Sequence, residues 1–381
     1  MTWLRNAWVR LFDEERDAYV LGLLRVALGA LLFLNGGRLI LDFERQGYFA
    51  DFFFMPIVPG SLVPSRTVYE LLLAGQAVAA ACACLGWRPR EALFGASSIG
   101  LFVLLCDRLQ YHNNRYALLL LGGLLSLTPC DRSFLLVHRP AHWHLPEPAR
   151  IAPTFARRLF QCQVSLVYLG SACGKLLDAD WRGGQVLLLR FLKTAEICAQ
   201  YGIPLPHPLA QLLSAAWFAS AAAKAAITTE LFILLGIWFP RTRRVALWVG
   251  VLFHFWIEVS ARVELFSWLM GASYLAFVTP ELRERRFEFD PDRAAGRALA
   301  RSVLLLDWCA RFDVTPLPFG ERGRAACYVT NREGCRRDGI GAVSHLAEAL
   351  PLLFPFWLPL ALITRTRNFP IFGNQTPKIG D

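Results

Sequence analysis

The chain has 381 residues, of which 55% are hydrophobic, 13% aromatic and only 18% charged, and its mean hydropathy is +0.37. These values exclude an ordinary soluble domain and predict an integral membrane protein. The formal net charge of +10 is then explained by contact with anionic lipid, and it gives no reason to expect a nucleic-acid partner.

Eight apolar runs of about 15 to 20 residues follow one another along the chain, close to the length that crosses a bilayer. They lie at residues 19–36, 68–86, 92–106, 116–129, 159–177, 227–239, 245–260 and 264–279. We therefore predict an all-α integral membrane bundle of about eight transmembrane helices. The Ala-rich stretch 209–224 is expected either to extend the sixth helix or to lie at the interface. Arg25, in the first run, is expected to face the bundle interior and to pair with a carboxylate.

The loops predict the orientation of this bundle. No small-residue cleavage site follows the first run, so we expect that run to stay as an anchor. If the N-terminus is cytoplasmic, alternate connections carry the denser basic clusters, among them Arg88, Arg132, Arg157, Arg243 and Arg285. This is the distribution that the positive-inside rule requires. Both the N-terminus and the C-terminal tail are then predicted to be cytoplasmic.

Four polar clusters fall on the opposite, exoplasmic side of this topology. They are His112, Asn113 and Asn114 before the fourth helix, Lys175 with Asp178, Asp180 and Trp181 at the end of the fifth, Glu230 in the sixth, and His254 with Glu258 in the seventh. A lysine at membrane depth costs roughly 2.5 to 3.5 kcal/mol, so Lys175 needs a partner or a task. His254 and Glu258 are four residues apart and can hydrogen-bond on one helix face. The four clusters lie on the same side of the membrane, and this convergence predicts a ligand-binding site.

Each cluster also has a structural interpretation. His112 and the two asparagines can cap the fourth helix, and Glu230 can hold helices together. Lys175 can extend its ammonium to the lipid headgroups. The ten cysteines have no paired CxxC spacing, and several lie in apolar runs as small hydrophobes, so we expect no metal site.

Three segments resemble the vitamin K-dependent gamma-glutamyl carboxylases and the wider HTTM membrane domain family, over about residues 15 to 285. The matching segments are Val167-Tyr168 through Gly174-Lys175 to Asp178-Ala179-Asp180-Trp181, His112-Asn113-Asn114-Arg115-Tyr116, and Phe253-His254. The resemblance implies that Lys175 is a candidate base that deprotonates a reduced quinone. It further implies that His112, Asn113, Asn114 and His254 are candidate hydrogen-bond donors to that quinone.

The chain departs from the carboxylase pattern at the base. The family's lysine lies five residues before the tryptophan, where this chain has Leu176, and one residue turns a helix by about 100°. The carboxylases' long lumenal portion also has no counterpart here. We therefore expect a site for a quinone or a lipid and no carboxylation of proteins. The alternatives are a non-catalytic binding or accessory protein and, third, a thiol oxidoreductase.

Residues 286–381 differ in character from the membrane domain at 1–285 and predict a small α/β or mixed tail domain. The tail resembles the DCC family of thioredoxin-like oxidoreductases, which implies that the two family cysteines are replaced by Arg293 and Gly296. Disulfide exchange needs an attacking thiolate, so we expect this copy to be redox-inactive. The tail can equally be a plain cytoplasmic cap. Pro351, Pro355 and Pro359 predict broken helices near the end of the chain.

Overall fold

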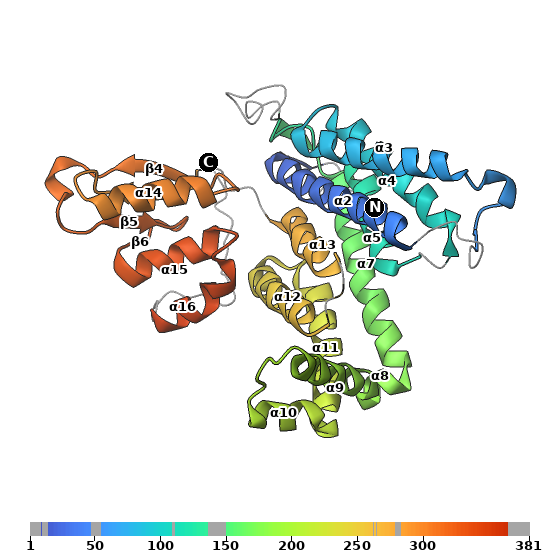
Figure 1. Ribbon diagram of the computed structural model, residues 1–381. Helices are drawn as coiled ribbons and strands as arrows, with labels where there is room; N and C mark the ends of the chain where they lie inside the picture. The colour runs from blue at the N-terminus through green and yellow to red at the C-terminus, as the bar shows by residue number, and fades with distance from the viewer. Residues whose placement is uncertain are drawn as a thin grey trace, which may run out of the picture. The chain divides into compact units, whose positions relative to one another are not determined.

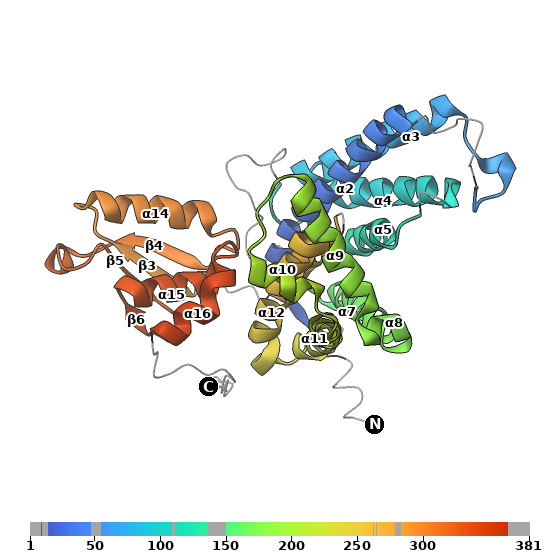
Figure 2. The same ribbon diagram turned by 60° about the horizontal axis from the view of Figure 1, so that its bottom comes forward.

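A computed structural model describes residues 9, 14–46, 55–108, 111–135, 150–261, 263, 265–278 and 283–364. These residues are mostly helical, with one small sheet region towards the C-terminus (Figures 1 and 2). The chain divides into two compact units. Unit 1 comprises Met1–Trp238 and Leu252–Val278, and unit 2 comprises Phe239–Val251 and Thr279–Asp381.

Unit 1 is built from helices and one short pair of strands that lie far apart in the sequence. Its helices are α2 (Tyr19–Gln46), α3 (Arg66–Leu85), α4 (Pro89–Cys106), α5 (Asn113–Ser126), α7 (Phe155–Leu177), α8 (Ala179–Gly183), α9 (Gln185–Gln200), α10 (His207–Ser214), α11 (Ala216–Gly236), α13 (Phe266–Ser273), the 3-10 turns η2 (Gly60–Leu62) and η4 (Tyr274–Phe277), and the second part of α12 (Pro240–Ala261). Strands β1 (Glu15–Asp17) and β2 (Ile151–Pro153) pair antiparallel, and Arg150 fastens this pairing with an ion pair to Asp17 of 2.9 Å.

Four described helices are long and apolar enough to cross a membrane by length and composition. These spans are Tyr19–Leu41, Arg66–Leu85, Pro89–Cys106 and Ala216–Gly236. The remaining predicted runs are also helical, but α5 and α13 have only 14 and 8 residues, fewer than the roughly 20 that a straight crossing needs. The prediction of a membrane-embedded, mostly helical protein is confirmed, whereas the number of about eight spans stays a prediction.

The Ala-rich stretch resolves into two elements. Helix α10 ends at Ser214 and a new helix, α11, begins at Ala216. The part from Ala216 onward therefore extends the sixth predicted helix, and the part before it is separate.

Arg25 faces the interior as expected, but its hydrogen-bond partners are different. The side chain is fully buried and donates to the carbonyl oxygens of Cys130 at 3.1 Å and Phe134 at 2.7 Å. The expected carboxylate is Asp131, which interacts with Arg25 electrostatically, whereas the hydrogen bonds of Arg25 go to backbone carbonyls. The chain that follows α5 has carbonyls with no helical partner, and a guanidinium, with its five donors, can satisfy several of them.

Unit 2 is a four-stranded mixed sheet with helices on both faces, as Figure 2 shows. Strands β3 (Arg285–Phe289), β4 (Phe312–Pro316), β5 (Cys327–Thr330) and β6 (Arg336–Arg337) lie in the order β4-β3-β5-β6. Strand β4 is parallel to β3, whereas β5 and β6 are antiparallel to their neighbours. The expected small C-terminal α/β part is thus present.

The helices of unit 2 close over the apolar faces of the sheet. They are α14 (Ala294–Leu306), which joins β3 to β4, then α15 (Gly339–Ala349), α16 (Trp357–Ile363) and the 3-10 turns η5 (Phe319–Glu321) and η6 (Phe354–Phe356). Phe287, Val303, Phe312, Val329 and Leu346 form the centre of its core. The final apolar run breaks between Ala349 and Trp357, around Pro351 and Pro355, as the prolines predicted.

Gly296 takes one of the two positions where the DCC resemblance expects a cysteine. A β-carbon there would lie 2.9 Å from the carbonyl oxygen of Ala326 and closer still to that of Asp290. The backbone is therefore packed too closely at this turn of α14 to admit a side chain. The closing segment of the DCC resemblance, beyond Thr364, lies outside the described residues.

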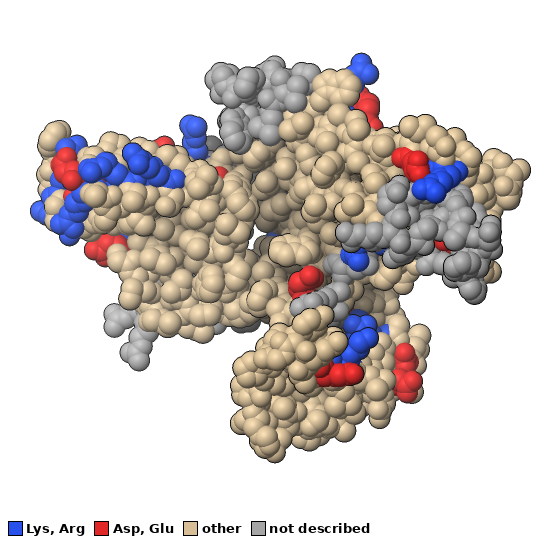
Figure 3. Space-filling view, in the orientation of Figure 1, with Lys and Arg blue, Asp and Glu red and all other residues tan. Residues whose placement is uncertain are grey.

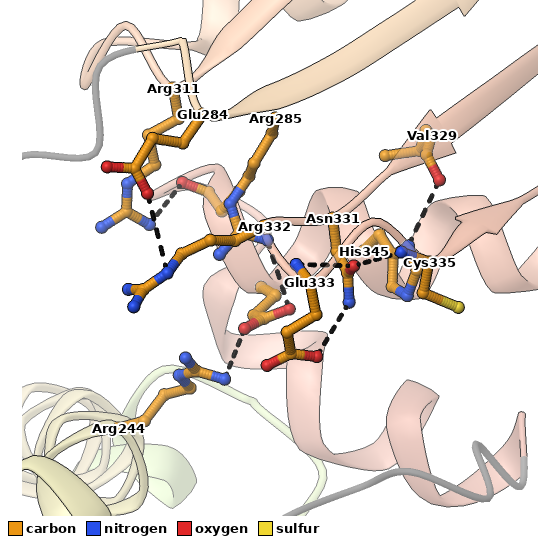
Figure 4. Close-up of polar contacts among 12 residues, drawn as sticks. Arg244, Glu284, Arg285, Arg311, Val329, Asn331, Arg332, Glu333, Cys335 and His345 are labelled. Carbon is orange, nitrogen blue, oxygen red and sulfur yellow. Dashed lines mark hydrogen bonds and ion pairs between the residues drawn. The ribbon is translucent and has the colours of Figure 1, made fainter. Parts of the chain in front are cut away.

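Glu348 of α15 links two other elements of unit 2 through ion pairs. Figure 4 labels its two arginine partners, Arg244 and Arg285. Glu348 pairs with Arg244, from the first part of α12, at 2.5 Å and with Arg285, from β3, at 3.4 Å. Burial alone would raise the pKa of Glu348, but these two guanidinium groups hold it below its ordinary value. Trp248 adds a hydrogen bond from its indole to the carbonyl oxygen of Pro355 at 2.9 Å.

Gly184 fixes the turn between α8 and α9 against α11. Its backbone has φ of 85°, in the left-handed region, and a β-carbon would lie 2.6 Å from the carbonyl carbon of Ala219. Gly183, one residue earlier, has no atom within 4 Å of its β-carbon position. Only the second glycine is therefore required by the packing.

We predict that Gly184→Ala lowers the free energy of unfolding by more than about 2 kcal/mol, because it combines backbone strain with a clash. Gly183→Ala is the matched control and should unfold like the wild type. Unfolding of the detergent-solubilised variants measures both. Equal stability of the two variants would contradict the close packing of this turn on α11.

Candidate functional site

One face of α7 carries the polar side chains that the sequence singles out. Tyr168, Ser171 and Lys175 are spaced three and then four residues apart, so they lie one above another on the same side of the helix. Helix α7 packs against α11 and α5, and Figure 1 shows it running down to α8. The polar face therefore points into unit 1.

Lys175 is bound to Glu230 of α11. Its ammonium lies 2.7 Å from Glu230 Oε1 and 3.0 Å from Oε2, and it also donates to the Ser171 hydroxyl at 2.5 Å. The Ser171 hydroxyl in turn donates to Glu230 Oε1 at 3.0 Å. The exposed fractions of the two charged side chains are only 16% and 6%. The lysine therefore has a carboxylate partner and does not simply extend to the lipid headgroups.

The acidic turn after α7 places a tryptophan beside this ion pair. Asp178 accepts hydrogen bonds from the backbone amides of Asp180 at 2.8 Å and Trp181 at 3.3 Å, and so caps α8. The Lys175 ammonium lies 5.1 Å from the centre of the Trp181 ring, within cation–π range. Asp178 and Asp180 themselves are exposed. Asp178 thus shapes the turn, and Trp181 contacts the charge.

Leu176 occupies the position of the carboxylases' base, but it lies away from the ion pair. It is 41% exposed, whereas Lys175 reaches Glu230 from a regular helix that ends at Leu177. The one-residue offset therefore does not remove the lysine from the interior face of α7.

A second polar cluster lies about two turns back along α7. The Tyr168 hydroxyl lies 2.7 Å from His254 Nε2, on α12, and 2.5 Å from the Tyr274 hydroxyl, on η4. All three side chains are buried. Glu230 interacts electrostatically with both tyrosines and Lys175 with His254. The two clusters therefore form one electrostatic unit within unit 1.

Polar atoms next to this second cluster are left without partners. His254 Nδ1, Glu258 Oε2 and Ser267 Oγ are buried and have no hydrogen-bond partner among the described residues. Ser267 follows Phe266, whose ring packs edge-on against His254. The predicted hydrogen bond between His254 and Glu258 does not form, because the imidazole is turned towards Tyr168. Unpaired buried polar atoms are costly, so these three atoms are candidates for a hydrogen bond to a ligand or to water.

The cluster before α5 is not joined to these groups. His112 is the N-cap of α5 but makes no side-chain capping bond, and both His112 and Asn113 are exposed. Asn114 Nδ2 is buried without a partner among the described residues. No described hydrogen bond or ion pair connects the three residues to Lys175, Glu230 or His254.

The polar face of α7 continues beyond the expected site. Trp238 donates to the Ser165 hydroxyl at 2.8 Å, Gln161 to the carbonyl oxygen of Ala276 at 2.7 Å, and Arg157 to the same carbonyl at 2.8 Å. Tyr168, Ser171 and Tyr274 were not predicted as site residues. The spacing of Tyr168 and Ser171 from Lys175 was a usable signal, whereas nothing near Tyr274 indicated its role.

The family model for the HTTM domain matches residues 14–281, more than half of the chain. The chain belongs to the HTTM family. The matched region contains α7, α11 and both polar clusters of this HTTM protein, and it ends before β3. No curated protein and no solved structure matches the chain. Among the described residues, no group of three or more His, Cys, Asp or Glu side chains could hold a metal ion.

We predict that Tyr168→Phe destabilises the protein by about 1 to 3 kcal/mol, because it leaves His254 Nε2 and the Tyr274 hydroxyl buried and unpaired. Tyr201→Phe is the control, since Tyr201 is 72% exposed. Reversible unfolding in mixed micelles compares the two. A Tyr168 variant as stable as the control would mean that the hydroxyl contacts contribute nothing.

Proposed function

We propose that this HTTM-family membrane protein binds a reduced quinone or a lipid at the polar site formed by the Lys175–Glu230 pair and the Tyr168–His254–Tyr274 cluster. The observation that carries the proposal is the buried ion pair, which lies beside Trp181 and within electrostatic range of a second cluster with unpaired polar atoms. Charged and polar groups at membrane depth are costly, and they usually mark a functional site.

The available donors and acceptors suit a ligand with oxygen substituents on an apolar body. The Lys175 ammonium can donate to a carbonyl or phenolate oxygen, and the Trp181 ring offers an apolar face. His254 Nδ1 and Glu258 Oε2 can take part in hydrogen bonds with a hydroxyl. A quinol carries such groups on a ring, and a lipid carries them on its headgroup.

The ion pair favours binding over base catalysis. The Lys175 nitrogen already donates to Ser171 and to both oxygens of Glu230, so it is engaged as a hydrogen-bond donor and is not positioned as an acceptor. The first function we propose is therefore ligand binding without turnover. Binding alone requires no second substrate at the site.

Chemistry on a quinol is the second candidate, and the resemblance to the carboxylases supports it. For this reaction Lys175 must first give a proton to Glu230, which leaves a neutral amine and a carboxylic acid. The amine can then accept the proton of the quinol hydroxyl. Glu230 is thus proposed as the residue that sets the protonation state of Lys175.

We further propose that the N-terminus and the tail are cytoplasmic and that the Lys175 end of α7 is exoplasmic. The distribution of arginine between the connections supports this orientation. A ligand would then enter from the exoplasmic half of the bilayer.

Mass spectrometry of the small molecules that copurify with the protein tests the proposal. We expect a quinone or a lipid to be retained by the wild type and to fall by at least about tenfold in Lys175→Met and in Glu230→Gln, a factor that corresponds to about 1.4 kcal/mol. Lys224→Met is the control, because Lys224 lies on the same helix as Glu230 but is exposed. Equal retention by all four proteins would overturn the proposal.

The same proteins separate binding from catalysis. Reduced quinone is added in the presence of oxygen and its consumption is followed. Turnover by the wild type that is lost in Lys175→Met supports the second candidate. Retention without turnover supports binding alone.

A further inference from the structure

We propose that helix α14 of the C-terminal tail docks on an anionic lipid surface. The inference rests on one exposed face of this helix, which combines arginines with large apolar side chains. It is independent of the polar site in unit 1.

The exposed face is a single stripe. Arg297, Arg301, Leu304 and Leu305 follow one another at intervals of four, three and one residues, so they lie within about 100° of one another around the helix axis. Trp308 comes two residues after the end of the helix. Leu304 and Leu305 are 67% and 74% exposed, and Trp308 is 40% exposed. We call these five residues the α14 stripe.

The fold of unit 2 does not use the stripe. The opposite side of α14 provides Gly296, Ala300 and Val303, which are buried against the sheet. Two adjacent leucines with more than half of their surface in water contribute nothing to this core. An amphipathic helix with a second, outward apolar face indicates a partner.

The charge of the stripe indicates which partner. Arg297 and Arg301 are exposed, and Figure 3 shows basic side chains gathered over the α14 part of the tail. Trp308 follows the helix, and its indole donates to the carbonyl oxygen of Leu305 at 3.0 Å. Arginine and tryptophan around a leucine centre are the composition of helices that lie in a membrane interface.

An anionic bilayer fits the stripe better than a protein groove. Helix α14 has 13 residues, and its mixed charge and apolar content favours a soft, negatively charged surface. The tail is also covalently joined to a unit with candidate membrane spans, which keeps a lipid surface within reach. This covalent link gives the tail a high effective concentration at the membrane, so even weak binding can hold it there.

Amide hydrogen exchange of the full-length protein in lipid nanodiscs tests this proposal. Exchange across residues 294–308 is compared in phosphatidylglycerol and in phosphatidylcholine nanodiscs. Each arginine near an anionic surface strengthens docking by about fivefold, so we expect Arg297→Gln/Arg301→Gln to weaken the additional protection in phosphatidylglycerol by about 30-fold. Arg324→Gln, an exposed arginine outside the stripe, should leave that protection unchanged.

Fluorescence quenching by brominated lipid supplies the apolar arm of the test. We expect brominated phosphatidylglycerol to quench the part of the tryptophan fluorescence that is lost in Trp308→Phe. The double variant Leu304→Glu/Leu305→Glu should abolish this quenching. Leu352→Glu is the control, because Leu352 is exposed elsewhere on the tail. Unchanged exchange of residues 342–350 verifies that each variant is folded.

Two results would overturn the proposal. One is equal exchange of residues 294–308 in the two lipids together with no quenching of Trp308. The other is protection of the stripe that disappears on dilution of the protein in either lipid, because that result assigns the stripe to contact with a second copy of the chain.

Discussion

A positive charge at the end of an apolar helix is the constraint on which unit 1 depends. The Lys175 side chain is only 16% exposed and cannot remain unpaired without a large cost, and Glu230 supplies both carboxylate oxygens within 3.0 Å. Removal of either residue would leave the charge of the other one buried without a partner. The pair therefore fixes α7 against α11 and at the same time concentrates charge beside Trp181. Stability and the proposed ligand binding would then depend on the same two residues and their neighbours.

The polar face of α7 extends this constraint along the helix. From Lys175 to Arg157 it is satisfied in turn by a carboxylate, by a histidine and one tyrosine, and by backbone carbonyls. A helix of this kind cannot face lipid, because every group on the face would lose its partner. Helix α7 has 23 residues, the length of a span, but its polar groups keep it out of the four described helices that are apolar enough to cross a membrane by composition. Three buried atoms next to this face, His254 Nδ1, Glu258 Oε2 and Ser267 Oγ, are the exception, because they have no partner among the described residues.

The sequence predicted those features that follow from composition and helix periodicity. It indicated a membrane bundle, the inward direction of Arg25 and the need of Lys175 for a partner, because each depends on the cost of a charge in an apolar run. It could not identify the partners, which are set by tertiary packing. Arg25 binds carbonyls 105 and 109 residues away, and His254 binds Tyr168 in preference to Glu258, although Glu258 lies on its own helix face. The breaks around Pro351 and Pro355 were predictable, since proline acts through local sterics. The close backbone packing at Gly296 could not be predicted, because it depends on the carbonyl oxygens of Asp290 and Ala326, which tertiary packing brings to this helix.

A double-mutant cycle on the unfolding free energy tests the central claim that Lys175 and Glu230 act as one buried pair. Lys175→Met and Glu230→Gln should each cost about 3 kcal/mol, and the double variant should cost little more than either, which gives a coupling energy of about 2 to 3 kcal/mol. The matched cycle of Lys224→Met with Glu230→Gln should show no coupling, because Lys224 is exposed. Additive effects of Lys175→Met and Glu230→Gln would contradict the account.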